Sequence, residues 1–224
     1  MSGWRPVTGV VVALAAVAGL VIGAVVDRAA ATFPWDGVGT RAATAVRRPA
    51  LELVTATVFA LVALRFGASW ELPAFLAGAG AGVLLAVIDV QHRLLPDRVV
   101  VPALLTGGLL LTGAAVADGR WDDLLRAGLG AGVLFVLFLV LALISPSALG
   151  MGDVKLAALL GLYLGWLGWD AVLLGAAAGF VVQAVLALLL LATRRIGLRG
   201  ELPFGPAMLL GAGVAVGWSS TILG

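Results

Sequence analysis

The chain has 224 residues, of which 62% are hydrophobic and only 12% are charged, too few polar side chains to cover a water-soluble globule. Fourteen basic against 12 acidic side chains give a formal charge of only +2, so nucleic-acid binding is not expected. Cysteine is absent, which excludes disulfides, thiolate zinc sites and cysteine nucleophiles. The composition therefore indicates a membrane protein.

Eight apolar segments approach the ~20 residues with which a helix crosses the ~30 Å hydrocarbon layer. In chain order they are Val7–Val26, Pro49–Leu64, Leu72–Ile88, Val99–Ala117, Leu124–Ile144, Val154–Leu167, Ala171–Ala192 and Leu202–Leu223. No compact basic start and small-residue cleavage site frame the first segment, which favours a span over a signal peptide. The sequence predicts an all-α, polytopic transmembrane helix bundle of about eight spans, with residues 1–224 forming a single integral-membrane domain and no soluble domain.

Basic residues predict the orientation of the bundle, because cytoplasmic connections retain positive charge. Alternate connections divide these residues into a set of ten and a set of four. The ten are Arg28, Arg41, Arg47, Arg48, Arg93, Arg98, Lys155, Arg194, Arg195 and Arg199, and the four are Arg5, Arg65, Arg120 and Arg126. The larger set is expected in the cytoplasm, with both termini outside, in the inner or plasma membrane of the cell.

Charges that adjoin apolar spans are costly, so the 12 acids are the first functional candidates. Most of these acids need no functional role, because they lie in solvated connections or at helix ends. Glu52 lies in the first turn of the second span, where the helix dipole stabilises its negative charge. Asp89 closes the third span and Asp153 opens the sixth, both on the expected cytoplasmic side. Two carboxyl groups at one depth can share a water molecule, one protonated and the other activating the water. This is the chemistry of an aspartyl protease.

Two glycines precede Asp153 in the run Gly150-Met151-Gly152-Asp153. A peptide bond in a membrane helix is protected by its own hydrogen bonds, so cleavage requires an extended substrate lying against the enzyme backbone. Gly150 and Gly152 carry no side chain that would obstruct this approach. Close helix packing or a turn explains the same glycines without catalysis.

Five blocks, in order along nearly the whole chain, resemble the type IV prepilin peptidases, relatives of the archaeal preflagellin peptidases within the Gly-x-Gly-Asp intramembrane aspartyl proteases. The blocks are Gly19–Gly23, Arg48–Thr55, Ile88-Asp89 followed by Leu95-Pro96-Asp97, Gly150–Leu156, and Leu202–Pro206. The resemblance implies that Asp89 and Asp153 are the catalytic pair. It also implies cleavage of the short basic leader of prepilin or pseudopilin substrates at the cytoplasmic membrane face, with these proteins and membrane lipid as partners.

Four further residues are candidates for substrate binding or support: Gly150, Gly152, Lys155 and Asp97. Asp97 either lies near the site or, with Pro96, begins and caps the fourth span. Lys155 is the only lysine; it could stabilise the Asp153 carboxylate, hold a substrate anion or anchor the chain at the membrane surface. Because Asp153 begins a helix and Asp89 ends one, the helix dipoles predict Asp153 as the resting base and Asp89 as the resting acid.

The first cytoplasmic connection, residues 27–48, departs from the pattern of the two-activity bacterial relatives. It is short and lacks the Cys-x-x-Cys motifs that bind zinc in those enzymes, which also methylate their products with S-adenosylmethionine. We therefore expect no metal and no cofactor. The N-methyltransferase activity is in doubt, and S-adenosylmethionine is expected only if that activity is retained.

Two other functions stay open. Asp89 and His92 are three residues apart and could form a metal site with Asp97 and Asp153, as in a metal-dependent membrane hydrolase. A small transporter or assembly scaffold could use the same acids to relay protons or bind a cation. The sequence fixes neither the particular substrate nor the oligomeric state.

Overall fold

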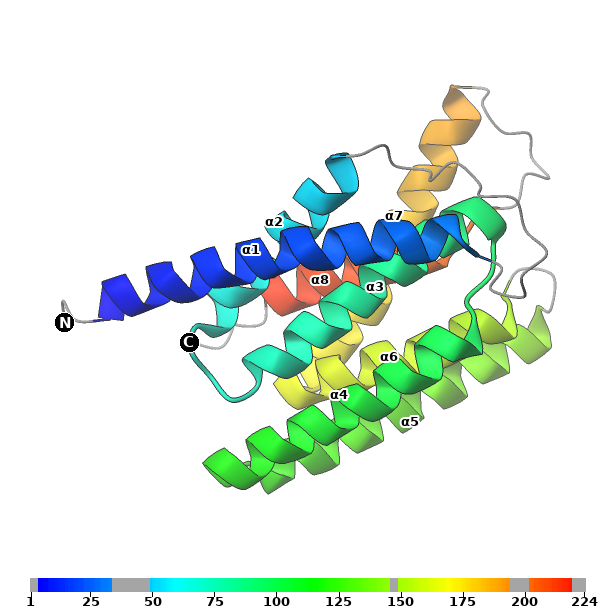
Figure 1. The fold of residues 1–224 in the computed structure, drawn as a ribbon. Coiled ribbons are helices and arrows are strands. Elements are labelled where there is room, and N and C mark those ends of the chain that lie inside the picture. The colour runs from blue at the N-terminus through cyan, green and yellow to red at the C-terminus, as the bar shows by residue number, and fades with distance from the viewer. Residues whose placement is uncertain (1–3, 34–48, 146–148, 194–201, 219–224) are drawn as a thin grey trace. The chain divides into compact units, whose positions relative to one another are not determined.

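The computed structural model describes residues 4–33, 49–145, 149–193 and 202–218. Eight α-helices make up the regular structure of these ranges (Figure 1). They are α1 (Trp4–Ala31), α2 (Ala50–Phe66), α3 (Leu72–His92), α4 (Asp97–Asp118), α5 (Trp121–Ile144), α6 (Met151–Leu167), α7 (Trp169–Ala192) and α8 (Gly205–Trp218). The prediction of an all-α bundle of about eight segments is confirmed within the described ranges.

Five of these helices are long and apolar enough to cross a membrane: α1, α3, α4, α5 and α7. The protein is therefore a multi-pass membrane protein. The helices α2 and α6 have 17 residues each and α8 has 14 described residues, so they reach less far. The end of the predicted eighth span, the basic residues 41, 47, 48, 194, 195 and 199, and most of the first connection lie outside the described ranges.

Contacts between residues divide the chain into two compact units, which are described separately. Unit 1 consists of Met1–Arg93 and Leu105–Gly119, and unit 2 of Leu94–Leu104 and Arg120–Gly224. The helix α4 contributes its first turns to unit 2 and its later turns to unit 1. That residues 1–224 act as one domain stays a prediction.

In unit 1, α1 and α2 pack so closely that their backbones touch. A Cβ atom placed on Gly19 would lie 2.6 Å from the Ala56 Cα atom, and one on Gly23 would lie 2.6 Å from the Glu52 Cα atom. Only glycine permits this approach, which is a common device in membrane helices because lipid provides no hydrophobic force between them. Helix α3 joins this pair. The predicted Gly19–Gly23 block thus serves helix packing.

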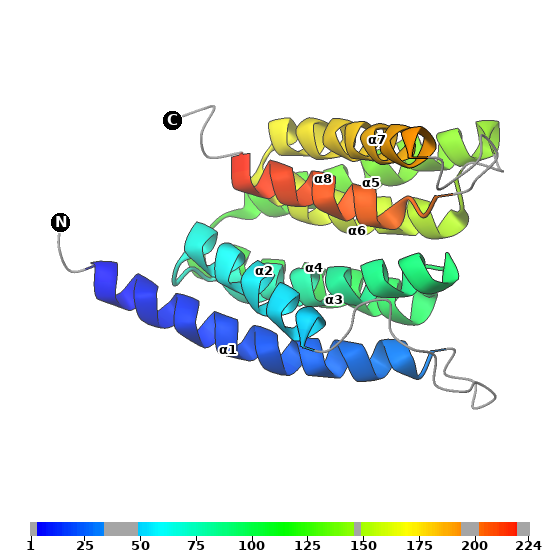
Figure 2. The ribbon, with the colours of Figure 1, turned by 90° about the horizontal axis from the view of Figure 1, so that it is seen from above.

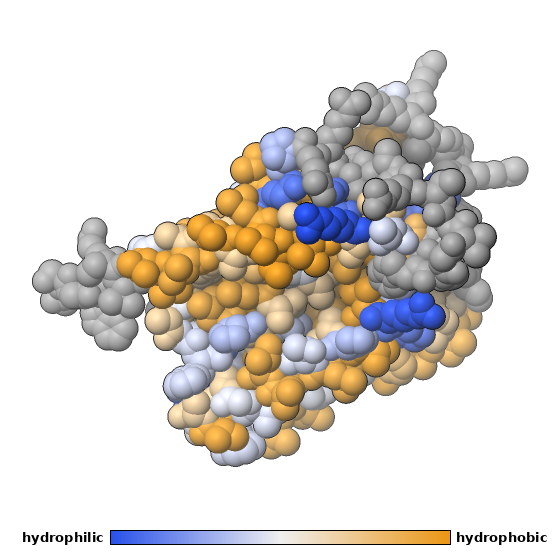
Figure 3. Space-filling view, viewed as in Figure 1, coloured by the Kyte–Doolittle hydropathy of each residue, from blue (hydrophilic) through white to orange (hydrophobic). Residues whose placement is uncertain are grey.

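The outward side of α1 is apolar. Figure 3 shows hydrophobic side chains gathered along this helix. Val10, Leu14, Val17 and Val21 are each more than half exposed. Such a continuous apolar surface is unfavourable in water and suits contact with lipid chains.

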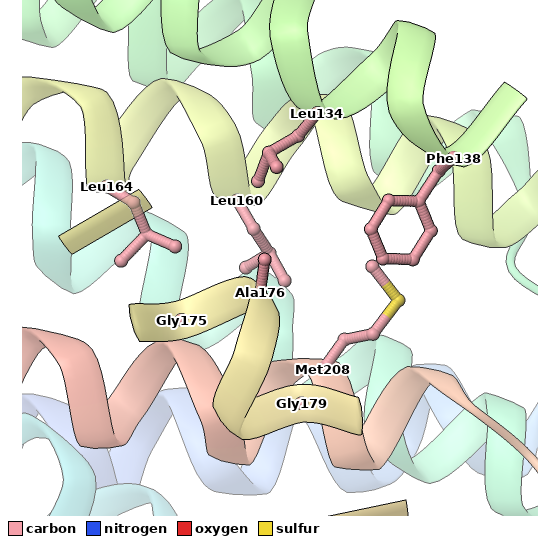
Figure 4. A pocket seen from close by; sticks show the side chains of 8 residues that line it. All are labelled: Leu134, Phe138, Leu160, Leu164, Gly175, Ala176, Gly179 and Met208. Carbon is pink, nitrogen blue, oxygen red and sulfur yellow. The ribbon is translucent and has the colours of Figure 1, made fainter. Parts of the chain in front are cut away.

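In unit 2, α5 packs against α6 and α7 packs against α8 (Figure 2). A Cβ atom on Gly130 of α5 would lie 2.6 Å from the carbonyl oxygen of Gly161 on α6. Gly211 of α8 approaches the backbone of Gly179 on α7 in the same way. An apolar pocket lies among the four helices, lined by Leu134, Phe138, Leu160, Leu164, Gly175, Ala176, Gly179 and Met208 (Figure 4).

Candidate active site

Asp89 lies in the last turn of α3, within unit 1. The helix ends just after it, because Arg93 adopts the left-handed conformation (φ 54°) and its N–H donates to the Asp89 carbonyl oxygen at 2.8 Å. Val87 and Ile88 belong to the hydrophobic core that α3 shares with α1 and α2, and this packing fixes the end of the helix. Only 5% of Asp89 is exposed. A carboxyl group is costly to bury, so this one is a strong functional candidate.

His92, three residues further on, lies against an aromatic ring. Its imidazole centroid is 4.9 Å from the ring centroid of Phe33, which follows α1. Within the described ranges, no three His, Asp or Glu side chains lie close enough to one another to hold a metal ion.

Asp153 is the third residue of α6, within unit 2, and caps its own helix. The backbone N–H of Gly150 donates to Asp153 Oδ2 at 3.0 Å, and the Asp153 N–H donates to the Gly150 carbonyl oxygen at 3.1 Å. Gly150 is extended (φ −84°, ψ 159°), which turns the chain into the helix. Because of this cap, α6 begins at Met151, three residues before the predicted Val154. The Asp153 carboxyl group is held at the positive end of the helix dipole.

The two glycines of this turn differ in their surroundings. A Cβ atom on Gly152 would lie 2.9 Å from Leu95 Cβ, so Leu95 leaves no room for a side chain there. A Cβ atom on Gly150 would meet Asp153 Oδ2 at 3.7 Å and the backbone nitrogen of Gly152 at 3.9 Å, both ordinary contact distances. Gly152 is therefore required for packing, whereas Gly150 is exposed and accessible from outside the turn.

Asp97 and Lys155 form an ion pair within unit 2. Lys155 Nζ donates to both carboxylate oxygens of Asp97, at 2.7 and 2.8 Å, and so connects the first residue of α4 to the first turns of α6. The side chains are 62% (Asp97) and 35% (Lys155) exposed, and pairs this exposed stabilise a fold by only ~0.2–1 kcal/mol. The pair therefore fixes geometry more than it adds stability.

The structure brings Gly150, Gly152, Asp153, Lys155 and Asp97 together at the start of α6. Asp89 is described separately, in unit 1. The sequence predicted no separate role for Leu95 and no pairing of Asp97 with Lys155. The pairing could have been suggested by charge, because Asp97 lies at one helix start and Lys155, the only lysine, lies near another.

Comparisons with known proteins identify the family of this chain. Residues 76–192 match the type IV leader peptidase family. A prepilin leader peptidase/N-methyltransferase of Stutzerimonas stutzeri is 32% identical over 183 residues, which are 81% of this chain and 62% of that protein. The protein of the same name from Bacillus subtilis (strain 168) is 33% identical over 180 residues, 78% of this chain and 67% of its own. The leader peptidase HopD of Escherichia coli is 38% identical over 156 residues, 68% of this chain and 97% of its own.

No solved structure matches the chain. The fold is that of a multi-pass helical membrane protein with one acid buried at a helix end and another capping a helix start. The chain belongs to the type IV leader peptidase family, and Asp89 and Asp153 both lie within the matched residues 76–192. It spans 62% of the length of the Stutzerimonas stutzeri relative.

Proposed function

We propose that this chain is a prepilin leader peptidase, an aspartyl endopeptidase that removes the short basic leader from prepilin or pseudopilin-like proteins. The observation that carries the proposal is the placement of Asp89 and the Gly150-x-Gly152-Asp153 turn at helix ends within the family match. Cleavage takes place at the cytoplasmic face of the inner membrane, and the excess of basic residues in the connections on the side of both helix ends supports this orientation.

Asp89 and Asp153 activate one water molecule between them. The ionised carboxylate takes a proton from the water as the water oxygen attacks the scissile carbonyl carbon, and the protonated carboxyl group donates its proton to the carbonyl oxygen. The tetrahedral intermediate then collapses, its C–N bond breaks and the leaving amine takes up a proton. The products are a free leader carboxylate and a new amino terminus.

Chain connectivity supports the meeting of the two acids. Only residues 93–96 connect α3, which carries Asp89, to α4, which begins at Asp97. Asp97 in turn is paired with Lys155, two residues after Asp153. Sharing one water molecule therefore requires that the last turn of α3 face the start of α6.

The exposed Gly150 offers a place for the substrate. A cleavable segment must be extended, and its unpaired backbone groups need partners that lie close by. At Gly150 no side chain separates the substrate from the enzyme backbone. The leader remains in water while the apolar helix of the substrate remains in the bilayer, so the scissile bond lies at the interface.

The test is cleavage of a prepilin by the purified chain in lipid nanodiscs, with the product mass measured at its amino terminus. Asp89→Asn and Asp153→Asn should each abolish cleavage, whereas Asp122→Asn, an exposed acid in the first turn of α5, should not. Activity should survive His92→Ala and a chelator. Loss of cleavage with the chelator, or full activity of either Asn variant, would contradict an aspartyl mechanism.

The same mass measurement reports methylation. We propose that cleavage proceeds without zinc or any cofactor, since the chain has no cysteine to form the zinc motifs of the two-activity relatives. Adding S-adenosylmethionine should then leave the mass of the new amino terminus unchanged. A product heavier by one methyl group would show that the transfer activity is retained.

A further inference from the structure

The segment from Leu95 to Asp97 meets the first turns of α6 at two points, on either side of Asp153. Leu95 packs against Gly152, the residue before Asp153. Asp97 binds Lys155, the second residue after it. The ion pair joins residues 58 apart in the chain, and the two contacts leave the Asp153 carboxyl group between them along the helix.

Lys155 is directed toward Asp97 rather than toward the carboxyl group of Asp153. Residues two apart on a helix do not face each other, so Asp153 and Lys155 project from different sides of α6. The Lys155 ammonium contacts both oxygens of Asp97. Such two-oxygen contact restrains α4 and α6 more than a single hydrogen bond would.

We propose that Asp97 and Lys155 are positioning residues, whose ion pair, with the Leu95–Gly152 contact, holds the first turn of α6 and thereby aims the Asp153 carboxyl group. This inference rests on the proposed function. The Gly150 N–H restrains one oxygen of Asp153, but that hydrogen bond moves with the turn, since both partners belong to it. Only a contact from outside the turn fixes where the carboxyl group points relative to the rest of unit 2.

The experiment measures kcat and KM for prepilin cleavage by the full chain in nanodiscs, together with its unfolding temperature. Lys155→Met and Asp97→Asn should each lower kcat roughly tenfold to 100-fold, as misplacement of a reacting group does, with KM unchanged. Lys155→Arg keeps the charge and the two-oxygen geometry, so it should recover most of the rate. The exchange Asp97→Lys with Lys155→Asp should recover more than either of its single changes. Asp122→Asn is the control for loss of an exposed acid at a helix start.

The outcomes separate this inference from the proposed function. An inactive wild-type chain would overturn both. Active wild-type protein with unchanged kcat in Lys155→Met and Asp97→Asn would overturn the positioning role alone. A loss of folded protein with normal kcat per folded molecule would show a structural role only, and a rise in KM at constant kcat would show a substrate contact. Either result would also overturn the inference.

Discussion

Arg126 of α5 donates from Nε to the carbonyl oxygen of Gly165 on α6, at 2.8 Å. Its Nη2 donates to the next carbonyl oxygen, that of Trp166, at 2.9 Å, and to Asp123 Oδ1 at 2.6 Å. The last carbonyl groups of a helix have no hydrogen-bond donor within the helix. In α6, Arg126 donates to two of these carbonyl groups, those of Gly165 and Trp166. The guanidinium of Arg120 lies 4.7 Å from the Trp166 ring centroid, so two arginines cover this helix end. The end of α6 opposite Asp153 is therefore anchored to α5.

Replacing Arg126 should destabilise the α5–α6 pair. Arg126→Met removes both donors and leaves two carbonyl groups without them, which costs about 1–3 kcal/mol. Arg126→Lys keeps the charge but lacks the planar fork, so it should recover only part of this loss. Unfolding in detergent micelles, followed by circular dichroism, provides the measurement. Equal stability of the Met variant and the wild type would contradict the capping role.

The close approach of α5 and α6 should make Gly161 intolerant of any side chain. A Cβ atom there would collide with the backbone of Gly130, which cannot turn aside, so Gly161→Ala should cost about 1–3 kcal/mol. Gly132→Ala is the matched control, because nothing lies within 4 Å of the position of its Cβ atom. Alanine at this control position should stabilise the helix by about 0.5–1 kcal/mol. If both variants unfold at the same denaturant concentration, the packing argument is wrong.

Alanine variants of the two glycines before Asp153 should distinguish an effect on folding from an effect on substrate access. Gly152→Ala presses on Leu95 and should lower both stability and activity. Gly150→Ala fits the fold and its extended backbone, so stability should stay near that of the wild type. Its methyl group should nevertheless reduce kcat/KM by obstructing the extended substrate. Thermal unfolding and cleavage rates of the two variants, measured side by side, check this; wild-type kcat/KM in Gly150→Ala would rule out substrate approach at that residue.

The protonation states of the two acids should differ at rest. Burial raises the pKa of the Asp153 carboxyl group, and the hydrogen bond from the Gly150 N–H acts against that rise. Because Asp153 lies at a helix start and Asp89 at a helix end, we expect Asp153 to be ionised and Asp89 to hold the proton. Infrared spectra of Asp89→Asn and Asp153→Asn, compared with wild type, identify the protonated carboxyl band. Since a coupled pair titrates as a unit, each variant is compared at several pH values. A protonated band that disappears only in Asp153→Asn would reverse the assignment.

The absence of cysteine gives a direct test of whether the two acids meet. In the double variant Asp89→Cys with Asp153→Cys, the introduced thiols are the only ones in the chain. A short bifunctional thiol reagent should join the two introduced cysteines within the protein. A protease site inserted between residues 89 and 122 lies inside both this pair and the control pair, so after cleavage only joined molecules keep their two fragments together on a denaturing gel. Asp89→Cys with Asp122→Cys is the control pair. Equal cross-linking in both pairs, or none in the first, would contradict a shared water molecule.

The sequence predicted the eight helices of the described ranges well because long apolar segments are readily recognised, although only five of these helices are long and apolar enough to cross a membrane. The ends were less accurate, because local polar contacts set them. Helix α6 starts three residues early through the cap between Gly150 and Asp153. Helix α1 continues to Ala31 instead of Val26, since Asp27 is only 6% exposed and remains within the packed helix.

The sequence likewise predicted the main residues of the candidate site but not the contacts between them. Asp89 and Asp153 stood out because acids at the ends of apolar spans are costly, and the surrounding motifs carried the family resemblance. The pairing of Asp97 with Lys155 was not predicted, because it depends on how α4 meets α6 across 58 residues. A single sequence shows the charges but not which of them become neighbours.

Lys155 holds the only side-chain amino group in the chain, and that group lies in the contact with Asp97. Apart from the amino terminus, a reagent selective for primary amines therefore has one target in the molecule. While the carboxylate holds the ammonium, acylation should be slow, and it should accelerate when the two helices part. The rate of labelling at this one amino group could thus report, in an otherwise unmodified protein, whether the ion pair between Lys155 and Asp97 is formed or broken during turnover.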